Sequence, residues 1–173
     1  MFMKKWFIVS FVVICCAASF IPFQKALVLT ETRNEQPNVS YLLLNSGNDF
    51  QIVFTHSIHL SDVIESYRVL TSNEFQLVSM KYSDVAIGMP GHAEEGQTLT
   101  YEDDLYTLRY EDAKLPNFTL HIGAVQHKLI LQYGEKEYDL KDNLVKGKSY
   151  FTEVRKISFY EKMKGVKLND NKE

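Results

Sequence analysis

The chain begins with one long apolar run and continues as a series of short ones. Trp6 to Phe23 is a run of eighteen residues without a charge, and it follows Lys4 and Lys5. As a helix, a run of this length approaches what is needed to cross a hydrocarbon core of about 30 Å. We therefore expect residues 1–25 to form a signal anchor that remains as a transmembrane helix. A cleaved secretory signal is the alternative, because it has a similar apolar segment.

Both alternatives imply the same orientation at the cell membrane. Lysines ahead of the first apolar segment stay in the cytoplasm, so the rest of the chain is exported. With the anchor in place, we expect a single-pass membrane protein whose C-terminal domain lies on the extracytoplasmic side. Cys15 and Cys16 both fall within the apolar run, so the exported part has no disulfide and no cysteine-ligated metal. Its stability must come from a packed core.

The short apolar stretches that follow have the composition and spacing of β-strands. They are rich in Tyr, Phe, Val, Ile, Leu and Thr, and turn-forming Gly, Pro, Asn and Asp separate them. Strands at intervals of about 8–12 residues, with hardly any helix, predict an all-β fold: a single antiparallel β-sandwich or small barrel over residues 26–160. We also expect a short helix near Ser158–Lys164 and a polar C-terminal tail over residues 161–173. The predicted strands are Ala26–Arg33, Ser40–Leu44, Phe50–His56, Val63–Leu70, Phe75–Tyr82, Leu105–Tyr110, Asn117–Ile122, His127–Tyr133, Glu137–Leu140 and Tyr150–Ile157.

The charged residues argue against nucleic acid as a partner. Without Lys4 and Lys5, the chain has 17 basic and 22 acidic residues, a net charge near −5. These charges are scattered along the sequence, whereas nucleic acids and anionic membrane surfaces are bound by clustered basic residues. The sequence therefore predicts neither a nucleic-acid-binding face nor a basic membrane-binding patch.

One predicted hairpin places polar residues on an apolar strand face. A four-residue loop at 58–61 pairs His56 with Val63 and Phe54 with Glu65, and it brings the apolar side chains of both strands to one face. His56 and Glu65 then lie on that face as diagonal neighbours, which long side chains can bridge. A carboxylate on an apolar face is costly unless it is paired or neutralised. We therefore expect Glu65 to form a hydrogen bond with His56 or with a nearby tyrosine hydroxyl.

The expected Glu65 pair has three interpretations. The favoured one is a structural pair that fixes the strand register. Structural ion pairs also shift the pKa of such groups, so an unusual carboxylate is not by itself a sign of function. The second is a small-ligand site, and the third is catalysis by His56 and Ser57. Adjacent strand residues point to opposite faces, so Thr55 and Ser57 would point away from His56, and we expect no enzyme.

A second predicted hairpin brings in a further histidine. A four-residue loop at 123–126 pairs Ile122 with His127 and Phe118 with Leu131, so His127 ends an apolar face. A metal ion held by His56 and His127 is conceivable, but no spaced ligand motif accompanies these residues. We expect no metal and no other cofactor.

Several of these residues also carry a family resemblance. The segments Thr55-His56-Ser57 and Val63-Ile64-Glu65-Ser66-Tyr67, a later Gly88-Met89-Pro90 and the late His127 resemble a bacterial family catalogued as domain of unknown function 1850. The likeness spans roughly residues 26–155. Members are often encoded beside TRAP-type solute transporters of the TAXI class. The resemblance implies a non-enzymatic accessory protein whose partner is the membrane subunit or the solute-binding subunit of such a transporter.

The alternative function is a small-ligand-binding module of the cell envelope, centred on His56, Glu65 and His127. We expect the polar residues of the two hairpins and of the resemblance to form either a ligand-binding or a structural polar cluster. Its members are Thr55, His56, Ser57, Glu65, Tyr67, Gly88, Pro90 and His127, and none of them is assigned a catalytic role.

Overall fold

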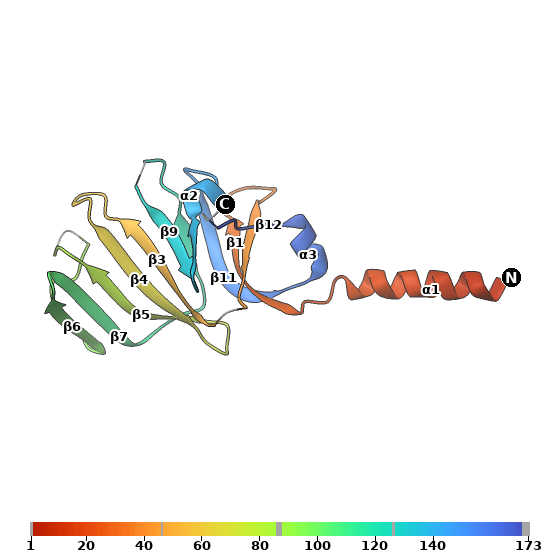
Figure 1. Ribbon diagram of the computed structural model, residues 1–173, viewed down its shortest axis with the longest axis horizontal. Coiled ribbons are helices and arrows are strands. Elements are labelled where there is room, and N and C mark those ends of the chain that lie inside the picture. Colours follow the sequence, from red (N-terminus) through yellow and green to blue (C-terminus); the bar gives the residue numbers. More distant parts are fainter. Residues whose placement is uncertain (1, 46, 86–87, 126, 171–173) are drawn as a thin grey trace.

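Two β-sheets pack face to face, and one helix projects away from them (Figure 1). The computed structural model describes residues 2–45, 47–85, 88–125 and 127–170. Neither sheet closes on itself, so the expected sandwich is confirmed and the small barrel is not the fold. The helices are α1 (Phe2–Ala18), α2 (Leu140–Asn143) and α3 (Phe159–Lys164).

The smaller sheet has five strands and contains both the first and the last strand of the chain. Its order is β12-β2-β1-β11-β8, and all pairs are antiparallel except β12 with β2. The strands are β1 (Gln24–Glu31), β2 (Val39–Leu43), β8 (Phe118–His121), β11 (Ser149–Ile157) and β12 (Val166–Lys167).

The larger sheet has seven strands in the order β10-β9-β3-β4-β5-β7-β6. Each pair of neighbours is antiparallel. The strands are β3 (Asp49–Thr55), β4 (Asp62–Val69), β5 (Phe75–Tyr82), β6 (Gln97–Glu102), β7 (Leu105–Leu115), β9 (Leu129–Tyr133) and β10 (Lys136–Asp139).

The main core lies between the two sheets. Leu27 and Leu29 of β1 belong to the same buried cluster as Phe50 and Ile52 of β3 and Leu131 of β9. Alternate residues of each strand face this cluster because successive side chains of a strand point to opposite faces. The apolar pattern that predicted the strands is therefore the pattern that fills the core.

The β3–β4 hairpin has the predicted faces but not the predicted register. Thr55 pairs with Asp62 and Ile52 with Glu65, so the loop contains residues 56–61. The Leu60 N–H donates to the His56 carbonyl, and Leu60 has a left-handed φ of 56°. This turn removes His56 from the strand. A shift of two residues leaves every side chain on its predicted face, because the faces alternate with a period of two.

The second predicted hairpin does not form. β8 pairs with β11 in the smaller sheet, whereas β9 pairs with β3 and β10 in the larger one. A strand with one apolar face can pack that face on the core from either sheet. The alternating pattern therefore does not determine with which strand it pairs. Ile122 lies fully buried, and its N–H donates to the Lys148 carbonyl. Gln126, in the predicted loop, is outside the described residues.

The folded domain continues past the predicted boundary at residue 160. β12 extends the smaller sheet at β2, and Leu168 is buried with its N–H donating to the Tyr41 carbonyl. The polar tail expected from residue 161 is thus part of the fold up to Leu168, because Val166 and Leu168 supply an edge strand and a core side chain. Residues 171–173 lie outside the described part of the chain.

The N-terminal helix makes a separate structural element. In Figure 1, α1 leaves the sandwich at one end and continues away from it. Its apolar side chains are largely exposed, for example Trp6, Phe11 and Ile14. Within the described residues, none of the helices combines the length and the apolar character needed to cross a membrane.

Candidate functional site

A groove between the two sheets is the candidate functional site. It has a volume of about 350 Å³ and opens where β3, β4 and β9 face β8 and the chain that follows it. Its apolar walls are formed by Ile52, Phe54, Leu120, Val125 and Leu129. Its polar lining consists of Thr55, Ser57, Glu65, His121, His127, Lys128 and Lys141. The groove therefore joins an apolar interior to a polar rim, as ligand sites commonly do.

A larger hollow of about 600 Å³ lies elsewhere, along β3, β4 and β9. Its charged residues include Arg68 and Asp49, which already form an ion pair with 2.8 Å between Nε and Oδ1. Both side chains are more than half exposed. This hollow, whose ion pair lies at the exposed surface, is a weaker candidate than the groove, where an acidic side chain lies among apolar ones.

Glu65 is the acidic group inside the groove. It lies on β4 between Ile52 of β3 and Met80 of β5, and it is only partly exposed. The Tyr67 hydroxyl donates a hydrogen bond of 2.7 Å to Glu65 Oε2. Burial raises the pKa of Glu65, and this hydrogen bond opposes the rise only in part. Of the two partners expected for Glu65, the structure therefore has the tyrosine hydroxyl.

Tyr67 holds its hydroxyl in place through its ring. The ring stacks on Phe50 with a centroid distance of 5.1 Å and on Phe118 of the opposite sheet at 5.5 Å. Burial and the charge of Glu65 raise the pKa of Tyr67, so the hydroxyl remains a donor. Next to this pair, β5 has an extra residue, Val78, between the partners of Ser66 and Tyr67. Such bulges bend a strand locally and change the direction of nearby side chains.

The rim of the groove carries most of its charge. Lys128 forms an ion pair with Asp62 of β4, and its N–H donates to Thr55 Oγ1 at 3.2 Å. Lys141, at the start of α2, donates from Nζ to the Val125 carbonyl. His121 Nδ1 lies 3.1 Å from Ser149 Oγ. Four basic side chains, including the two histidines, thus line a groove whose acidic lining residue is Glu65.

The eight residues predicted as one polar cluster separate into three groups. Thr55, Ser57, Glu65 and His127 line the groove, and Tyr67 lies behind Glu65. His56 begins the β3–β4 loop and is not among the lining residues; its Nδ1 is 3.5 Å from the His59 backbone nitrogen. The predicted His56–Glu65 contact is therefore absent from the described residues.

Gly88 and Pro90 form the third group. They border a different hollow of about 320 Å³, together with Met89, His92, Glu94 and Gln97. The buried Tyr82 hydroxyl donates to the Pro90 carbonyl at 2.5 Å, which fixes this turn on the larger sheet. Gly88 has a φ of 90°, a conformation that residues with a Cβ rarely adopt. The Gly-x-Pro segment thus has a structural role that does not require the groove.

A family model for a domain of unknown function, DUF1850, matches residues 50–140. The match begins in β3, ends at the first residue of α2 and contains all eight residues of the predicted cluster. The chain belongs to the DUF1850 family. No curated protein and no solved structure matches it. In this DUF1850 protein, the matched region includes every lining residue of the groove except Lys141.

Among the polar lining residues of the DUF1850 groove, sequence reasoning missed three: His121, Lys128 and Lys141. They come from β8, from the residue before β9 and from α2, which meet only because the two sheets pack together. No local pattern identifies them, since their neighbours in the groove are distant in sequence. Among the described residues, no three His, Cys, Asp or Glu side chains are placed to hold a metal ion.

Proposed function

We propose that this DUF1850 protein is a membrane-attached binding domain whose groove holds a small organic acid with an apolar body. The observation that carries this proposal is the charge of the groove. Two lysines and two histidines line its rim in a chain of net charge −3, and burial raises the pKa of Glu65, the one acidic residue among the described lining residues.

The charge distribution favours an anionic ligand. Lys141 and Lys128 bind to a backbone carbonyl and to an exposed carboxylate, both at the surface, where a ligand carboxylate can replace or join these partners. The apolar body would lie against Ile52, Phe54 and Leu120. Burial favours the protonated form of Glu65, and in that form its carboxyl can donate a hydrogen bond to an oxygen of the ligand.

Glu65 is available for such a contact. Its Oε2 accepts the hydrogen bond from Tyr67, and Oε1 accepts none from the described residues. Glu65 also takes no part in the ion pairs of that part of the chain. Among the described residues no buried side-chain oxygen lacks a hydrogen-bond partner, so Oε1 is open to solvent in the groove, where a ligand can reach it.

Binding of three ligands with the same apolar chain tests the proposal. The full-length protein in a non-ionic detergent is titrated calorimetrically with hexanoate, hexylamine and hexanol. We expect hexanoate to bind saturably and most tightly. Lys141→Met should weaken that binding about tenfold, which corresponds to about 1.4 kcal/mol. Lys146→Met is the matched control, because Lys146 is an exposed lysine that does not line the groove.

Two results would contradict the assignment. Stronger binding of hexylamine, lost in Glu65→Gln, would show that Glu65 works as an anion and that the groove selects cations. Equal losses in Lys141→Met and Lys146→Met would show that the acid binds by general charge attraction and not in the groove.

Attachment through α1 is part of the same proposal. The exposed apolar side chains of α1 and of the segment that follows it support it, since a water-exposed surface of this kind is unfavourable. On this proposal, the protein remains in the membrane fraction, and its C-terminal domain is digested by protease added from the extracytoplasmic side. A soluble, N-terminally shortened main species would favour the cleaved signal.

The wider role we propose is assistance to a TRAP-type transporter of the TAXI class, without catalysis. The family resemblance supports it, and a domain that holds a small acid at the outer face of the membrane is suited to such a role. Co-purification of the tagged full-length protein with the solute-binding or membrane subunit of the transporter would be the expected result. Retention of the acid with no transporter subunit would favour an independent binding module.

A further inference from the structure

The short helix α3 is fixed against the base of α1. The Tyr160 N–H donates to the Ser19 carbonyl at 3.0 Å, and the rings of Phe20 and Tyr160 lie 4.6 Å apart between centroids. The Phe23 N–H donates to the Ile157 carbonyl just before α3 begins. Figure 1 shows α3 at the end of the sandwich from which α1 projects. Whatever surrounds the base of α1 therefore also meets α3.

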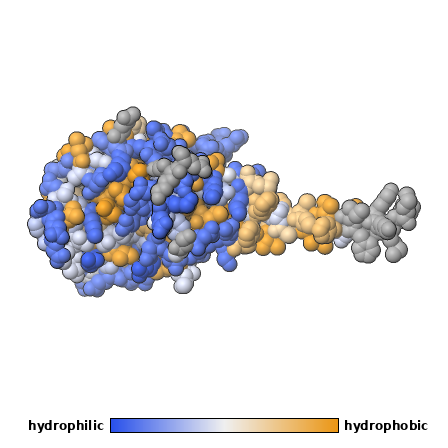
Figure 2. Space-filling model, viewed as in Figure 1, coloured by the Kyte–Doolittle hydropathy of each residue, from blue (hydrophilic) through white to orange (hydrophobic). Residues whose placement is uncertain are grey.

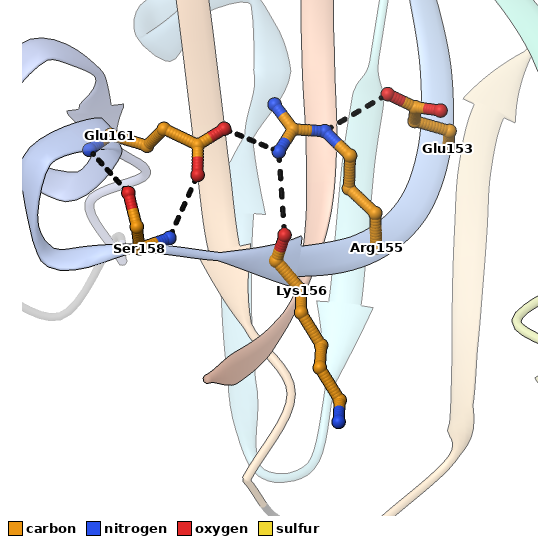
Figure 3. A network of polar contacts seen from close by, with 5 residues as sticks. All are labelled: Glu153, Arg155, Lys156, Ser158 and Glu161. Carbon is orange, nitrogen blue, oxygen red and sulfur yellow. Dashed lines mark hydrogen bonds and ion pairs between the residues drawn. The ribbon is translucent and has the colours of Figure 1, made fainter. Parts of the chain in front are cut away.

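A network of polar contacts keeps this six-residue helix folded (Figure 3). The Glu161 N–H donates to Ser158 Oγ, and the Ser158 N–H donates to Glu161 Oε2 at 2.8 Å, which together form a capping box. Arg155 Nη1 donates to Glu161 Oε1 at 2.6 Å. Burial opposes ionisation of Glu161, but the hydrogen bonds from Ser158 and Arg155 outweigh it and lower the pKa. Both carboxylate oxygens of Glu161 are thus satisfied within the fold.

The outer side of α3 is apolar and uncovered. Phe159 is 52% exposed and Met163 is 70% exposed. These two residues are four positions apart, so they lie on the same helix face. We call the exposed apolar side chains of this face and of the linker after α1 the α3 patch; its members are Phe20, Ile21, Phe23, Phe159 and Met163. Figure 2 shows apolar surface where α1 joins the sandwich.

Two lysines lie beside the α3 patch without carboxylate partners among the described residues. Lys162 Nζ lies over the Phe23 ring, 5.8 Å from its centroid, and donates to Gln24 Oε1. Lys164 Nζ lies 5.0 Å from the centroid of the Tyr160 ring. Neither belongs to an ion pair in the described part of the chain. The scattered charges of the sequence predict no basic patch; the fold brings these ammonium groups to an aromatic, apolar surface.

We propose that the α3 patch lies in the headgroup region of an anionic phospholipid membrane, with Phe159 and Met163 at the boundary of the acyl chains and Lys162 and Lys164 at lipid phosphates. The inference rests on the proposed attachment through α1. Apolar side chains flanked by lysines are the pattern of helices that lie in a membrane interface. Continuity with exposed, apolar α1 favours lipid over a second protein surface. The contact would hold the sandwich against the membrane instead of leaving it on a flexible tether.

Spin labels in the full-length protein test this contact. Three single-cysteine variants, each also carrying Cys15→Ala and Cys16→Ala, are placed in lipid nanodiscs with neutral or anionic lipid. Val13→Cys reports on α1, Met163→Cys on the α3 patch, and Leu105→Cys is an exposed apolar control on the strand β7. Accessibility to oxygen and to a water-soluble nickel complex is measured for each label.

We expect the oxygen-to-nickel accessibility ratio at 163 to exceed that at 105 several-fold. Anionic lipid should raise the ratio at 163, and Lys162→Gln with Lys164→Gln should remove that increase. A membrane-buried label at 13 with a water-exposed label at 163 would overturn the α3 contact and leave the attachment standing. Water-exposed labels at both positions would overturn both. Strong dipolar coupling between two copies labelled at 163 would identify a second protein chain as the occupant and overturn the lipid assignment.

Discussion

Tyr67→Phe isolates the hydrogen bond inside the groove. The substitution removes the hydroxyl that donates to Glu65 Oε2 at 2.7 Å and keeps the ring between Phe50 and Phe118. Little packing energy is therefore lost, and the measured change reports on the polar contact. Tyr41→Phe is a matched control, because Tyr41 is as buried as Tyr67, 7% exposed in each case. Its hydroxyl donates to a neutral acceptor, the Lys162 carbonyl, at 3.2 Å.

The expected magnitudes differ because one acceptor can carry a charge. A hydrogen bond to a charged group contributes about 1.5–3 kcal/mol to the free energy of unfolding, and one between neutral groups about 0.5–1.5 kcal/mol. Glu65 is only partly buried, so water can replace some of the lost contact. We expect Tyr67→Phe to cost about 1.5 kcal/mol at neutral pH, and Tyr41→Phe about 0.5–1 kcal/mol.

The pH dependence of the loss in stability distinguishes Tyr67→Phe from Tyr41→Phe more sharply than the loss at one pH. The pKa of Glu65 is raised above its ordinary value of 4.5, so its protonated form is favoured by folding. The associated stability is fully present below pH 4.5 and is lost as the pH rises through the folded-state pKa. The Tyr67 hydroxyl limits this loss because it stabilises the carboxylate. The cost of Tyr67→Phe should therefore grow with pH, whereas the cost of Tyr41→Phe should not.

Urea unfolding of the full-length protein in detergent measures both variants at about pH 4, just below the ordinary pKa of glutamate, and at about pH 8, well above it. A larger shift of the midpoint at the higher pH, for Tyr67→Phe alone, supports the reasoning. Equal costs for the two variants at both pH values would show that the ionised Glu65 does not depend on Tyr67. The charge assignment of the groove would then also be wrong.

Three further predictions concern single side chains. Glu65→Gln should raise the free energy of unfolding relative to wild type more at about pH 8 than at about pH 4, because it removes a carboxylate that burial penalises; the same urea series measures it. Glu65→Ala should cost about 1–3 kcal/mol, since it leaves the Tyr67 hydroxyl unpaired, whereas Asp62→Ala, which breaks an exposed ion pair, should cost about 0–1 kcal/mol. Ser158→Ala should weaken α3 by about 1 kcal/mol, seen as faster amide hydrogen exchange in 159–164.

Most strands could be predicted because a strand is recognised from consecutive residues, by its alternating apolar side chains and the turn residues at its ends. The strand Phe75–Tyr82 has the predicted bounds, and the predicted face shared by Phe54, Val63 and Glu65 is also correct. The strand β6 was missed because Gln97–Glu102 is mostly polar and half exposed, as suits a strand at the edge of its sheet.

Strand pairing and register depend on residues that are distant in sequence, and they determine which side chains meet in the groove. Residues 56–61 form a turn of their own, which moved His56 away from Glu65, and nothing in an alternating pattern separates a loop of four residues from one of six. Likewise, the pattern could not assign β8 and β9 to different sheets. That assignment brings Leu120 and His121 to the same groove as Glu65.

The groove and the α3 patch draw on different parts of the chain, so their functions should be separable. All lining residues of the groove except Lys141 lie in the region matched by the DUF1850 family model, residues 50–140. The α3 patch and its lysines lie before and after that region. Ligand binding is therefore expected to follow the family domain, and membrane contact to follow the flanking segments. Lys141→Met should weaken hexanoate binding without changing the accessibility of a label at 163, and substitution of Lys162 and Lys164 should do the reverse. If both properties change together in either variant, the ligand and the membrane are bound by one coupled surface, and the division at the family boundary does not reflect function.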